Sequence, residues 1–307
     1  MPEQRRDFRS GFVSIVGRPN AGKSTLLNAL VGTKLAIVAD KPQTTRTAVQ
    51  GVWHAPNAQV VFVDTPGIHR SDTLFNRKMM HEVRTALDER DLLLYLADAT
   101  LPFEEEDAHA IDLVRKTETP TFLVLNKVDR LKDKADLLPL IEQYKSCFAF
   151  EEYIPVSALK GDGLDALRTA ILTKLPEGPP YFGADYVTDQ PERFLAAEMI
   201  REKILHETRH EVPHSVAVLV DHFEEKKTLT HISATIFVER EGQKGIIIGS
   251  KGSMLKTIGS ASRLDIERML GRKVFLELTV KVRTNWRDSP EFLNQLDWRA
   301  MIGSGVE

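Results

Sequence analysis

The feature that most restricts how this chain folds is the segment Gly17-Arg18-Pro19-Asn20-Ala21-Gly22-Lys23-Ser24, followed by Thr25. It fits the pattern G-x-x-x-x-G-K-[ST], in which glycines let consecutive backbone N–H groups point at phosphate oxygens. A strand-length apolar run, residues 12–16, precedes the segment, and a helix-like stretch, 23–31, follows it. Because a strand, a glycine loop and a helix N-terminus together form a phosphate site, the segment predicts a nucleotide-binding domain.

The rest of the first half repeats this alternation of apolar runs and helix-like stretches. The apolar runs are 12–16, 60–63, 92–97, 121–125 and 153–156, and the helix-like stretches are 23–31, 76–87, 104–116, 133–146 and 164–175. Continuous apolar runs bounded by helices indicate a mainly parallel sheet that is covered on both faces. We therefore predict an α/β, doubly wound domain over residues 1–178.

The composition indicates a second domain and a reducing compartment. The 307 residues exceed what one hydrophobic core usually supports, roughly 250 to 300 residues. Cys147 is the single cysteine, so an internal disulfide and a cysteine-cluster metal site are excluded. The longest apolar runs fall far short of the roughly 18 residues that a membrane span requires. We expect a cytoplasmic protein that is not secreted.

The second half has a different order of elements. Proline and glycine at 176–180 interrupt the pattern, and residues 179–190 are predicted as a linker. A helix (191–209), two strands (215–223 and 230–239), a glycine-rich segment, a helix (253–270) and a strand (273–282) follow. This order predicts a smaller α+β domain over 191–287, with a C-terminal tail at 288–307.

Three tetrapeptides identify the base and the metal. They are Asp64-Thr65-Pro66-Gly67, Asn126-Lys127-Val128-Asp129 and Ser157-Ala158-Leu159-Lys160, and each follows a predicted strand. Asp64 suits a metal shell, and the Gly67 N–H suits the γ-phosphate. The Asp129 carboxylate suits the two N–H donors of guanine, which adenine lacks, and a backbone N–H of the third tetrapeptide suits the guanine O6. We therefore predict GTP and GDP as nucleotides, with Lys23 on the phosphates and Ser24 on Mg²⁺.

With Gln43-Thr44-Thr45-Arg46 as a switch I segment, the first half resembles the translation-factor class of GTPases. The resemblance implies a switch threonine, either Thr44 or Thr45, of which we favour Thr45 as Mg²⁺ ligand and γ-phosphate sensor. The predicted catalytic set is Lys23, Thr45 and Gly67, and the predicted Mg²⁺ ligands are Ser24, Thr45 and Asp64.

One position departs from the Ras-like pattern. Ile68 stands where those enzymes have a water-orienting glutamine. Asn20 resembles the asparagine with which several such GTPases hold K⁺. Together they motivate the hypothesis that K⁺ stimulates hydrolysis.

A second glycine loop lies in the second domain. Residues 249–252 fit G-x-x-G, and K-homology (KH) domains clamp about four nucleotides with such a loop. The segment from Arg240 to Arg287 contains 11 Lys and Arg and 4 Asp and Glu. This is a local charge excess of +7 in a chain of net charge −3. The element order resembles the type II KH fold. The predicted RNA-contacting residues are Ile246, Ile247, Ile248, Gly249, Ser250, Lys251, Gly252 and Lys256, although the three isoleucines are equally suited to a core.

A GTPase domain followed by a type II KH domain resembles the Era family of GTPases, over about residues 10–285. The resemblance implies a bacterial ribosome-assembly factor that binds the 3′ end of 16S rRNA and the 30S subunit. It also implies peripheral association with the cytoplasmic face of the inner membrane, and we expect a monomer. The alternatives are a membrane-associated regulatory or transport GTPase without RNA binding, and an RNA-binding module with a vestigial nucleotide site.

Two weaker patterns remain. Residues 206–210 fit H-E-x-x-H, a zinc-protease signature. We interpret them as a solvated helix end, because Pro213 follows and no third ligand has persuasive spacing. In the tail, Phe292, Leu293, Leu296 and Ala300 have helical spacing, with Trp298 beside them. They suit packing against a domain, with membrane contact as the alternative.

Overall fold

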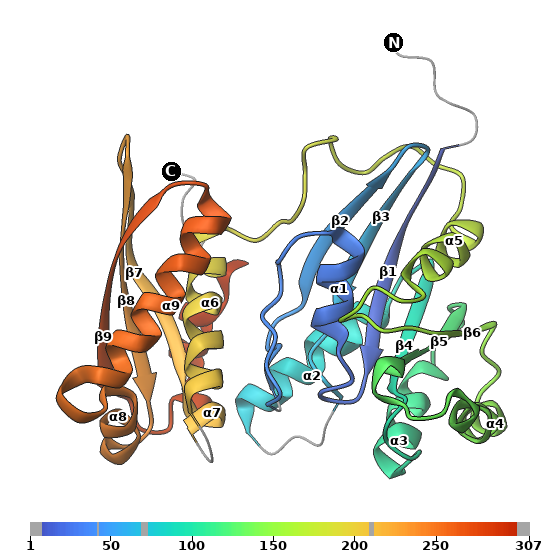
Figure 1. Cartoon of the computed structure of the whole chain (residues 1–307), viewed down its shortest axis with the longest axis horizontal. Helices are drawn as coiled ribbons and strands as arrows, with labels where there is room; N and C mark the ends of the chain where they lie inside the picture. The colour runs from blue at the N-terminus through green and yellow to red at the C-terminus, as the bar shows by residue number, and fades with distance from the viewer. Residues whose placement is uncertain (1–7, 42, 69–72, 209–211, 300–307) are drawn as a thin grey trace. The chain divides into compact units, whose positions relative to one another are not determined.

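The computed structural model describes residues 8–41, 43–68, 73–208 and 212–299 (Figure 1). These residues divide into two compact units. The first unit contains most of the chain up to Asp189, and the second contains Gln190 onward together with the described residues of two short segments, 37–41 with 43–44, and 73–77.

The first unit contains a six-stranded sheet with the order β2-β3-β1-β4-β5-β6. Its strands are β1 (Arg9–Gly17), β2 (Val49–Ala55), β3 (Ala58–Asp64), β4 (Leu92–Asp98), β5 (Thr121–Asn126) and β6 (Glu152–Pro155). Every neighbouring pair is parallel except β2 and β3. The carboxyl ends of the parallel strands therefore meet at one edge, which is where open α/β sheets bind ligands.

Helices cover both faces of this sheet (Figure 1). They are α1 (Lys23–Val31), α2 (Leu74–Leu87), α3 (Glu105–Val114), α4 (Leu137–Cys147) and α5 (Leu164–Lys174). Buried residues of α1 and α5 pack in one apolar cluster against the sheet, and those of α2, α3 and α4 pack in another. The predicted doubly wound α/β fold is thus confirmed.

The second unit has a three-stranded sheet in the order β7-β8-β9, with β7 antiparallel and β9 parallel to β8. Its elements are α6 (Glu192–Glu207), α7 (Val212–Ser215), β7 (Ala217–Glu225), β8 (Leu229–Val238), α8 (Glu241–Ile248), α9 (Ser253–Leu270), β9 (Lys273–Val282) and α10 (Pro290–Leu296). Apolar side chains of α6 and α9 share one buried cluster with the three strands. The predicted α+β fold of the KH type is confirmed.

Strand β2 and the short helix α7 were missing from the sequence-based description, and α8 was described only as a glycine-rich segment. The edge strand β2 contains Gly51 and polar residues, so it lacks a strong apolar signature, and its pairing with β3 stabilises it. The glycine-rich segment before the second glycine loop is a helix, α8, although it contains Gly242 and Gly245. Gln243 caps α8, because its side-chain oxygen accepts from the backbone N–H groups of Glu239 and Arg240.

The division into units also differs from the boundaries drawn on the sequence. Residues 37–41, 43 and 44, predicted within the first domain, belong to the second unit, where Ile37 is buried in the apolar core. Residues up to Asp189, predicted as linker, belong to the first unit. They pack there because the Gln59 side-chain oxygen accepts from the N–H groups of Tyr181 and Phe182.

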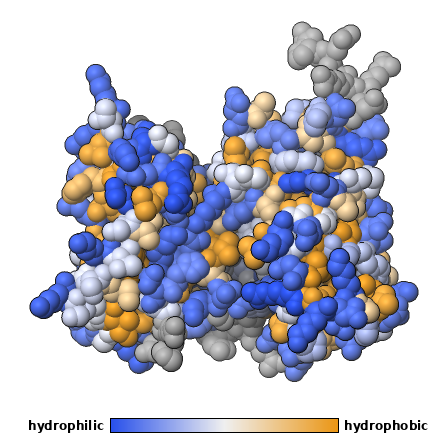
Figure 2. Space-filling model, viewed as in Figure 1, coloured by the Kyte–Doolittle hydropathy of each residue, from blue (hydrophilic) through white to orange (hydrophobic). Residues whose placement is uncertain are grey.

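The described part of the C-terminal tail packs within the second unit. Phe292 and Trp298 are buried, and Phe292 makes edge contacts with Phe237 and Trp286. Ala300 lies outside the described residues. No helix in the described ranges has both the length and the apolar character needed to cross a bilayer. On the face shown in Figure 2, apolar residues are interspersed among hydrophilic ones.

Candidate nucleotide and RNA sites

The phosphate loop connects β1 to α1. Its last glycine, Gly22, caps α1 with φ 98°, a left-handed conformation that glycine tolerates. The Lys23 ammonium is buried and donates to the carbonyl oxygens of Gly17 at 3.1 Å and Arg18 at 2.7 Å. Burial lowers the pKa of Lys23 to about 8, and the neighbouring Asp64 opposes this shift. Both acceptors of the ammonium are therefore carbonyl oxygens of the phosphate loop itself.

Three side-chain oxygens meet beside the loop. The Ser24 hydroxyl lies 2.7 Å from both the Thr45 hydroxyl and the Asp64 Oδ2 atom, and Thr45 donates to the same Oδ2 at 3.3 Å. The other carboxylate oxygen of Asp64 is buried and has no hydrogen-bond partner among the described residues. Burial raises the pKa of Asp64 to about 6. Two hydroxyls around a buried carboxylate with a spare oxygen fit Mg²⁺, which prefers oxygen ligands.

The structure distinguishes the two candidate switch threonines by position. The Thr44 hydroxyl donates to the backbone carbonyls of Lys41 and Ala39, whereas the Thr45 hydroxyl lies with Ser24 and Asp64. The favoured threonine is therefore the one that lies at the predicted metal site.

The segment after β3 packs against the phosphate loop. A Cβ atom added to Gly67 would lie 2.8 Å from the Pro19 Cα atom, so Gly67 permits a close approach. The Thr65 hydroxyl donates to the Ile15 carbonyl at 2.9 Å and holds the start of this segment. Ile68 is buried in the apolar core and presents no polar atom to a water molecule.

The other two tetrapeptides meet at the opposite side of the loop. The buried Asn126 amide donates to the Ala21 carbonyl at 2.9 Å and accepts from the Ala158 N–H at 3.0 Å. The Ser157 hydroxyl donates to Asp129 at 2.6 Å, and the Leu159 side chain is exposed. The carboxylate predicted to bind guanine is thus held beside the segment predicted to read the guanine O6.

Lys127 joins this side of the site to the loop backbone. Its ammonium donates to the Asn20 carbonyl at 2.7 Å and pairs with Asp98 at 2.6 Å. Asp98 was not predicted from the sequence. Its signal was available, because it ends an apolar strand, β4, in the same way as Asp64 ends β3.

The structure brings all four predicted motifs together in the first unit. The residues involved are Gly17, Arg18, Pro19, Asn20, Ala21, Gly22, Lys23, Ser24, Thr25, Thr45, Asp64, Thr65, Pro66, Gly67, Asn126, Lys127, Asp129, Ser157, Ala158 and Leu159. We refer to the place where these four motifs meet as the nucleotide cradle.

The second glycine loop, residues 249–252, lies between α8 and α9. Gly252 caps α9 with φ 79°, and Lys251 before it also has a positive φ of 50°. Ile246 is 48% exposed, whereas Ile247 is fully buried in the apolar cluster of the second unit. For Ile247 the structure therefore shows the core environment, one of the two roles left open for these isoleucines.

The H-E-x-x-H pattern is only partly described. His206 and Glu207 end α6, and His210 lies outside the described residues. Within the described ranges, no group of three or more His, Cys, Asp or Glu side chains could hold a metal ion.

Comparison with known proteins identifies the family of each domain. Residues 12–127 match the family model of the 50S ribosome-binding GTPases, and residues 211–287 match that of the KH domain. The GTPase Era of Geobacter metallireducens is 51% identical over 293 residues, which are 95% of this chain and 98% of that protein. The GTPase Era of Syntrophus aciditrophicus is 49% identical and covers 95% of each chain. This chain belongs to the Era family of GTPases.

Solved Era structures have the same fold. A crystal structure of an Aquifex aeolicus Era variant bound to GDP·AlF4⁻ has a TM-score of 0.92 and 42% identity, covering 95% of this chain and 99% of that one. A crystal structure of Era with MgGDPNP and nucleotides 1506–1542 of 16S ribosomal RNA has a TM-score of 0.92 and 41% identity over the same shares. As a member of the Era family, the chain is a GTPase that uses GTP, GDP and Mg²⁺.

Proposed function

We propose that this chain is a GTP-dependent switch that binds the single-stranded 3′ end of 16S rRNA through its KH unit and assists assembly of the 30S subunit. The observation that supports the RNA target is the likeness, over 95% of the chain, to an Era that was solved with nucleotides 1506–1542 of 16S rRNA. The same proposal includes a monomeric, cytoplasmic protein with peripheral association with the inner membrane, supported by the family resemblance.

The glycine loop of the second unit supports the RNA role physically. It precedes the 18-residue helix α9, and a helix N-terminus favours phosphate groups. No heavy atom lies within 4 Å of a Cβ atom added to Gly252, so the backbone is open to an approaching ligand. Exposed Lys251 and Lys256 lie on the loop and on the first turns of α9. They supply positive charge for a phosphate backbone.

Hydrolysis follows from the residues of the first unit. With GTP bound, Lys23 would exchange its two carbonyl partners for phosphate oxygens, and Ser24, Thr45 and Asp64 would hold Mg²⁺. Bound Mg²⁺ neutralises charge on the phosphate oxygens. Asp129 selects guanine by accepting its two N–H donors. The Ile68 side chain has no polar atom, so another group orients the attacking water. The Asn20 amide is the candidate for holding an assisting K⁺.

The test measures RNA binding in two nucleotide states. A fluorescent RNA matching the 3′ end of 16S rRNA is titrated with the protein in GDP and in a non-hydrolysable GTP analogue. We expect tighter binding with the analogue, and loss of binding in Gly252→Asp, because that change places a carboxylate where a phosphate approaches.

Gly271→Asp is the matched control. Gly271 caps the other end of the same helix, has a positive φ of 65° and also has nothing within 4 Å of an added Cβ atom. It should therefore carry the same backbone penalty without touching the RNA. No measurable binding would refute the RNA role and favour a GTPase without RNA binding. Binding that is the same in both nucleotide states and in Gly252→Asp would show that the RNA does not engage this loop, which leaves a GTPase whose partner is unknown.

A further inference from the structure

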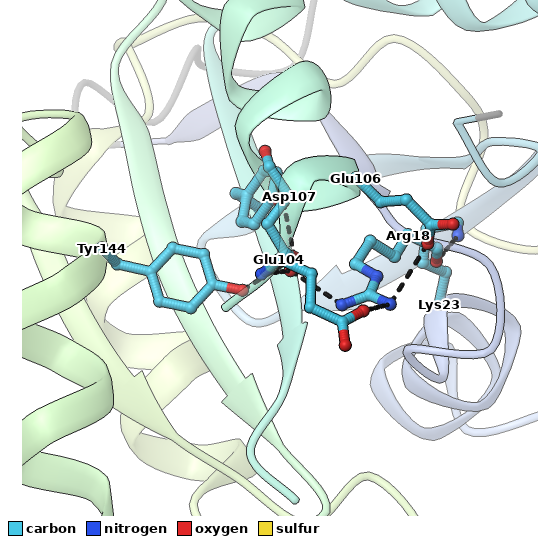
Figure 3. Close-up of polar contacts among 7 residues, drawn as sticks. Arg18, Lys23, Glu104, Glu106, Asp107 and Tyr144 are labelled. Atoms are coloured by element: carbon cyan, nitrogen blue, oxygen red, sulfur yellow. Dashed lines mark hydrogen bonds and ion pairs between the residues drawn. The ribbon is translucent and has the colours of Figure 1, made fainter. Parts of the chain in front are cut away.

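The Arg18 side chain does not point toward the nucleotide cradle. Its guanidinium contacts three carboxylates at the start of α3, namely Glu104 at 2.8 Å, Glu106 at 3.1 Å and Asp107 at 2.8 Å (Figure 3). The Arg18 side chain is 16% exposed and that of Asp107 is 2% exposed. Exposed ion pairs on a protein surface usually contribute little to stability. This pair differs from them because it is largely shielded from solvent.

The Asp107 carboxylate is fixed from four directions. One oxygen accepts from the hydroxyls of Tyr95 at 3.1 Å and Tyr144 at 2.8 Å. The other accepts from Arg18 at 2.8 Å and from the Glu104 backbone N–H at 3.1 Å. Burial and the adjacent Asp107 raise the pKa of Tyr144, so this tyrosine remains a neutral donor. With both oxygens engaged, the carboxylate has a defined orientation toward Arg18.

Arg18 connects this fixed carboxylate to the reacting part of the loop. While its side chain contacts α3, its backbone carbonyl accepts from Lys23 at 2.7 Å. The next residue, Pro19, packs against Gly67, whose N–H is the predicted contact of the γ-phosphate. A shift of Arg18 would therefore move Pro19 and the contact with Gly67.

We propose that Asp107 is a positioning residue for GTP hydrolysis, acting through the Arg18 guanidinium to fix the segment of the phosphate loop that contacts Gly67. The inference rests on the GTPase activity of the chain and adds a role for α3, which contributes none of the four nucleotide motifs. It concerns the γ-phosphate end of the site, so GTP turnover depends on it more than GDP binding does.

The first experiment compares Asp107→Asn, Arg18→Met and the double variant. We expect kcat for GTP to fall about 10-fold in each single variant, because a displacement of about 1 Å is enough to cost up to about 100-fold in rate. The affinity for GDP should change by less than about 3-fold, since GDP lacks the γ-phosphate. The double variant should lose no more kcat than Arg18→Met alone, because both changes break the same contact between Arg18 and Asp107. Arg18→Lys, which keeps the charge but not the fork of donors, should recover part of the rate.

Asp112→Asn is the matched control. Asp112 lies on the same helix and pairs with Arg115 at 2.6 Å, but both side chains are more than half exposed. Its kcat should equal that of the wild type. If Asp107→Asn fails to fold, Arg18→Met and Arg18→Lys test the same ion pair from the phosphate loop, because both leave the Asp107 carboxylate and its tyrosine donors in place. An unchanged kcat in Asp107→Asn or in Arg18→Met, additive losses, or a parallel fall in GDP affinity would overturn the proposal.

Discussion

The two glycine loops of this chain have the same local order of elements but differ in the side chains that pack against them. Each precedes a helix and ends in a glycine with a positive φ, Gly22 before α1 and Gly252 before α9. Behind the phosphate loop, Asn126 and Lys127 donate to the carbonyls of Ala21 and Asn20. An added Cβ atom at Gly22 would lie 2.4 Å from the Asn126 amide nitrogen, whereas at Gly252 it would meet nothing within 4 Å.

This difference separates two ways of binding phosphate. The first loop is held by two side chains at the end of β5, which fix its backbone before a ligand arrives, as catalysis of a charge-developing step requires. The second loop is open, which suits the backbone of a flexible single strand. A substitution in the first loop should therefore disturb the whole nucleotide site, whereas a substitution in the second loop should disturb only its own contact with the RNA.

The largest effect is expected from Gly22→Ala. The new methyl would displace Asn126, which also accepts from the Ala158 N–H, so one change disturbs both the phosphate loop and the base-reading segment. We expect GTP affinity to fall at least about 100-fold, equivalent to about 2.7 kcal/mol. Isothermal titration with GDP and a GTP analogue measures it.

Gly32→Ala is the control for backbone strain alone. Gly32 caps the other end of α1 with φ 85°, and an added Cβ atom meets nothing within 4 Å. It should cost about 1 kcal/mol of stability and leave GTP affinity unchanged. Equal losses of affinity in both variants would show that strain, and not the contact with Asn126, controls the first loop.

The next largest effect is expected from Asp129→Asn. The carboxylate would lose one or two charge-assisted hydrogen bonds to guanine, each worth about 1.5 to 3 kcal/mol, so GTP affinity should fall about 100-fold. Xanthosine triphosphate should gain affinity, because its base offers an acceptor where guanine has an amino donor. Competition between the two nucleotides measures the shift, with exposed Asp136→Asn as the control. An equal loss of affinity for the guanine and xanthine nucleotides would mean that the base does not bind at Asp129.

Sequence reasoning predicted the parts of the molecule that depend on local order. The phosphate loop and the three tetrapeptides each follow a strand, and parallel strands place their carboxyl ends at one edge, so the site follows from the fold. Helix α9 and strand β9 were predicted within a residue of their ends for the same reason: their apolar spacing is regular.

The missed features depend on contacts between distant residues. Strand β2 exists because β3 pairs with it, and the two-residue turn at Pro56 and Asn57 was an unused signal for this hairpin. The contact between Arg18 and Asp107 joins residues 89 positions apart, and no spacing rule connects them. Residues 37–41, 43 and 44 join the second unit because Ile37 packs in its core, which composition alone does not reveal.

A smaller effect is expected at the open loop, where adjacent isoleucines separate binding from stability. Ile246→Ala removes a side chain that is 48% exposed, so it should weaken RNA binding about 3- to 10-fold and change stability by less than about 0.5 kcal/mol. Ile247→Ala removes a fully buried one and should cost about 2 to 5 kcal/mol of stability. Chemical denaturation and RNA titration on both variants measure the two quantities. RNA binding unchanged in Ile246→Ala would restrict the RNA contact to the loop backbone and its lysines.

The smallest effect concerns the cation beside the phosphate loop. Asn20 has a positive φ of 61°, its carbonyl accepts from Lys127, and its side chain is exposed, so the amide is free to face the nucleotide from a fixed backbone. We expect turnover in K⁺ to exceed that in Na⁺ about 5-fold, or about 1 kcal/mol of barrier. Asn20→Gly suits the positive φ and removes only the amide, so it should abolish the difference while nucleotide affinity persists. Equal wild-type turnover in both salts would remove K⁺ from the mechanism, whereas a K⁺ advantage that survives in Asn20→Gly would place the cation on other oxygens. In the second case, cation binding would depend on the rigidity of the loop and not on the Asn20 side chain.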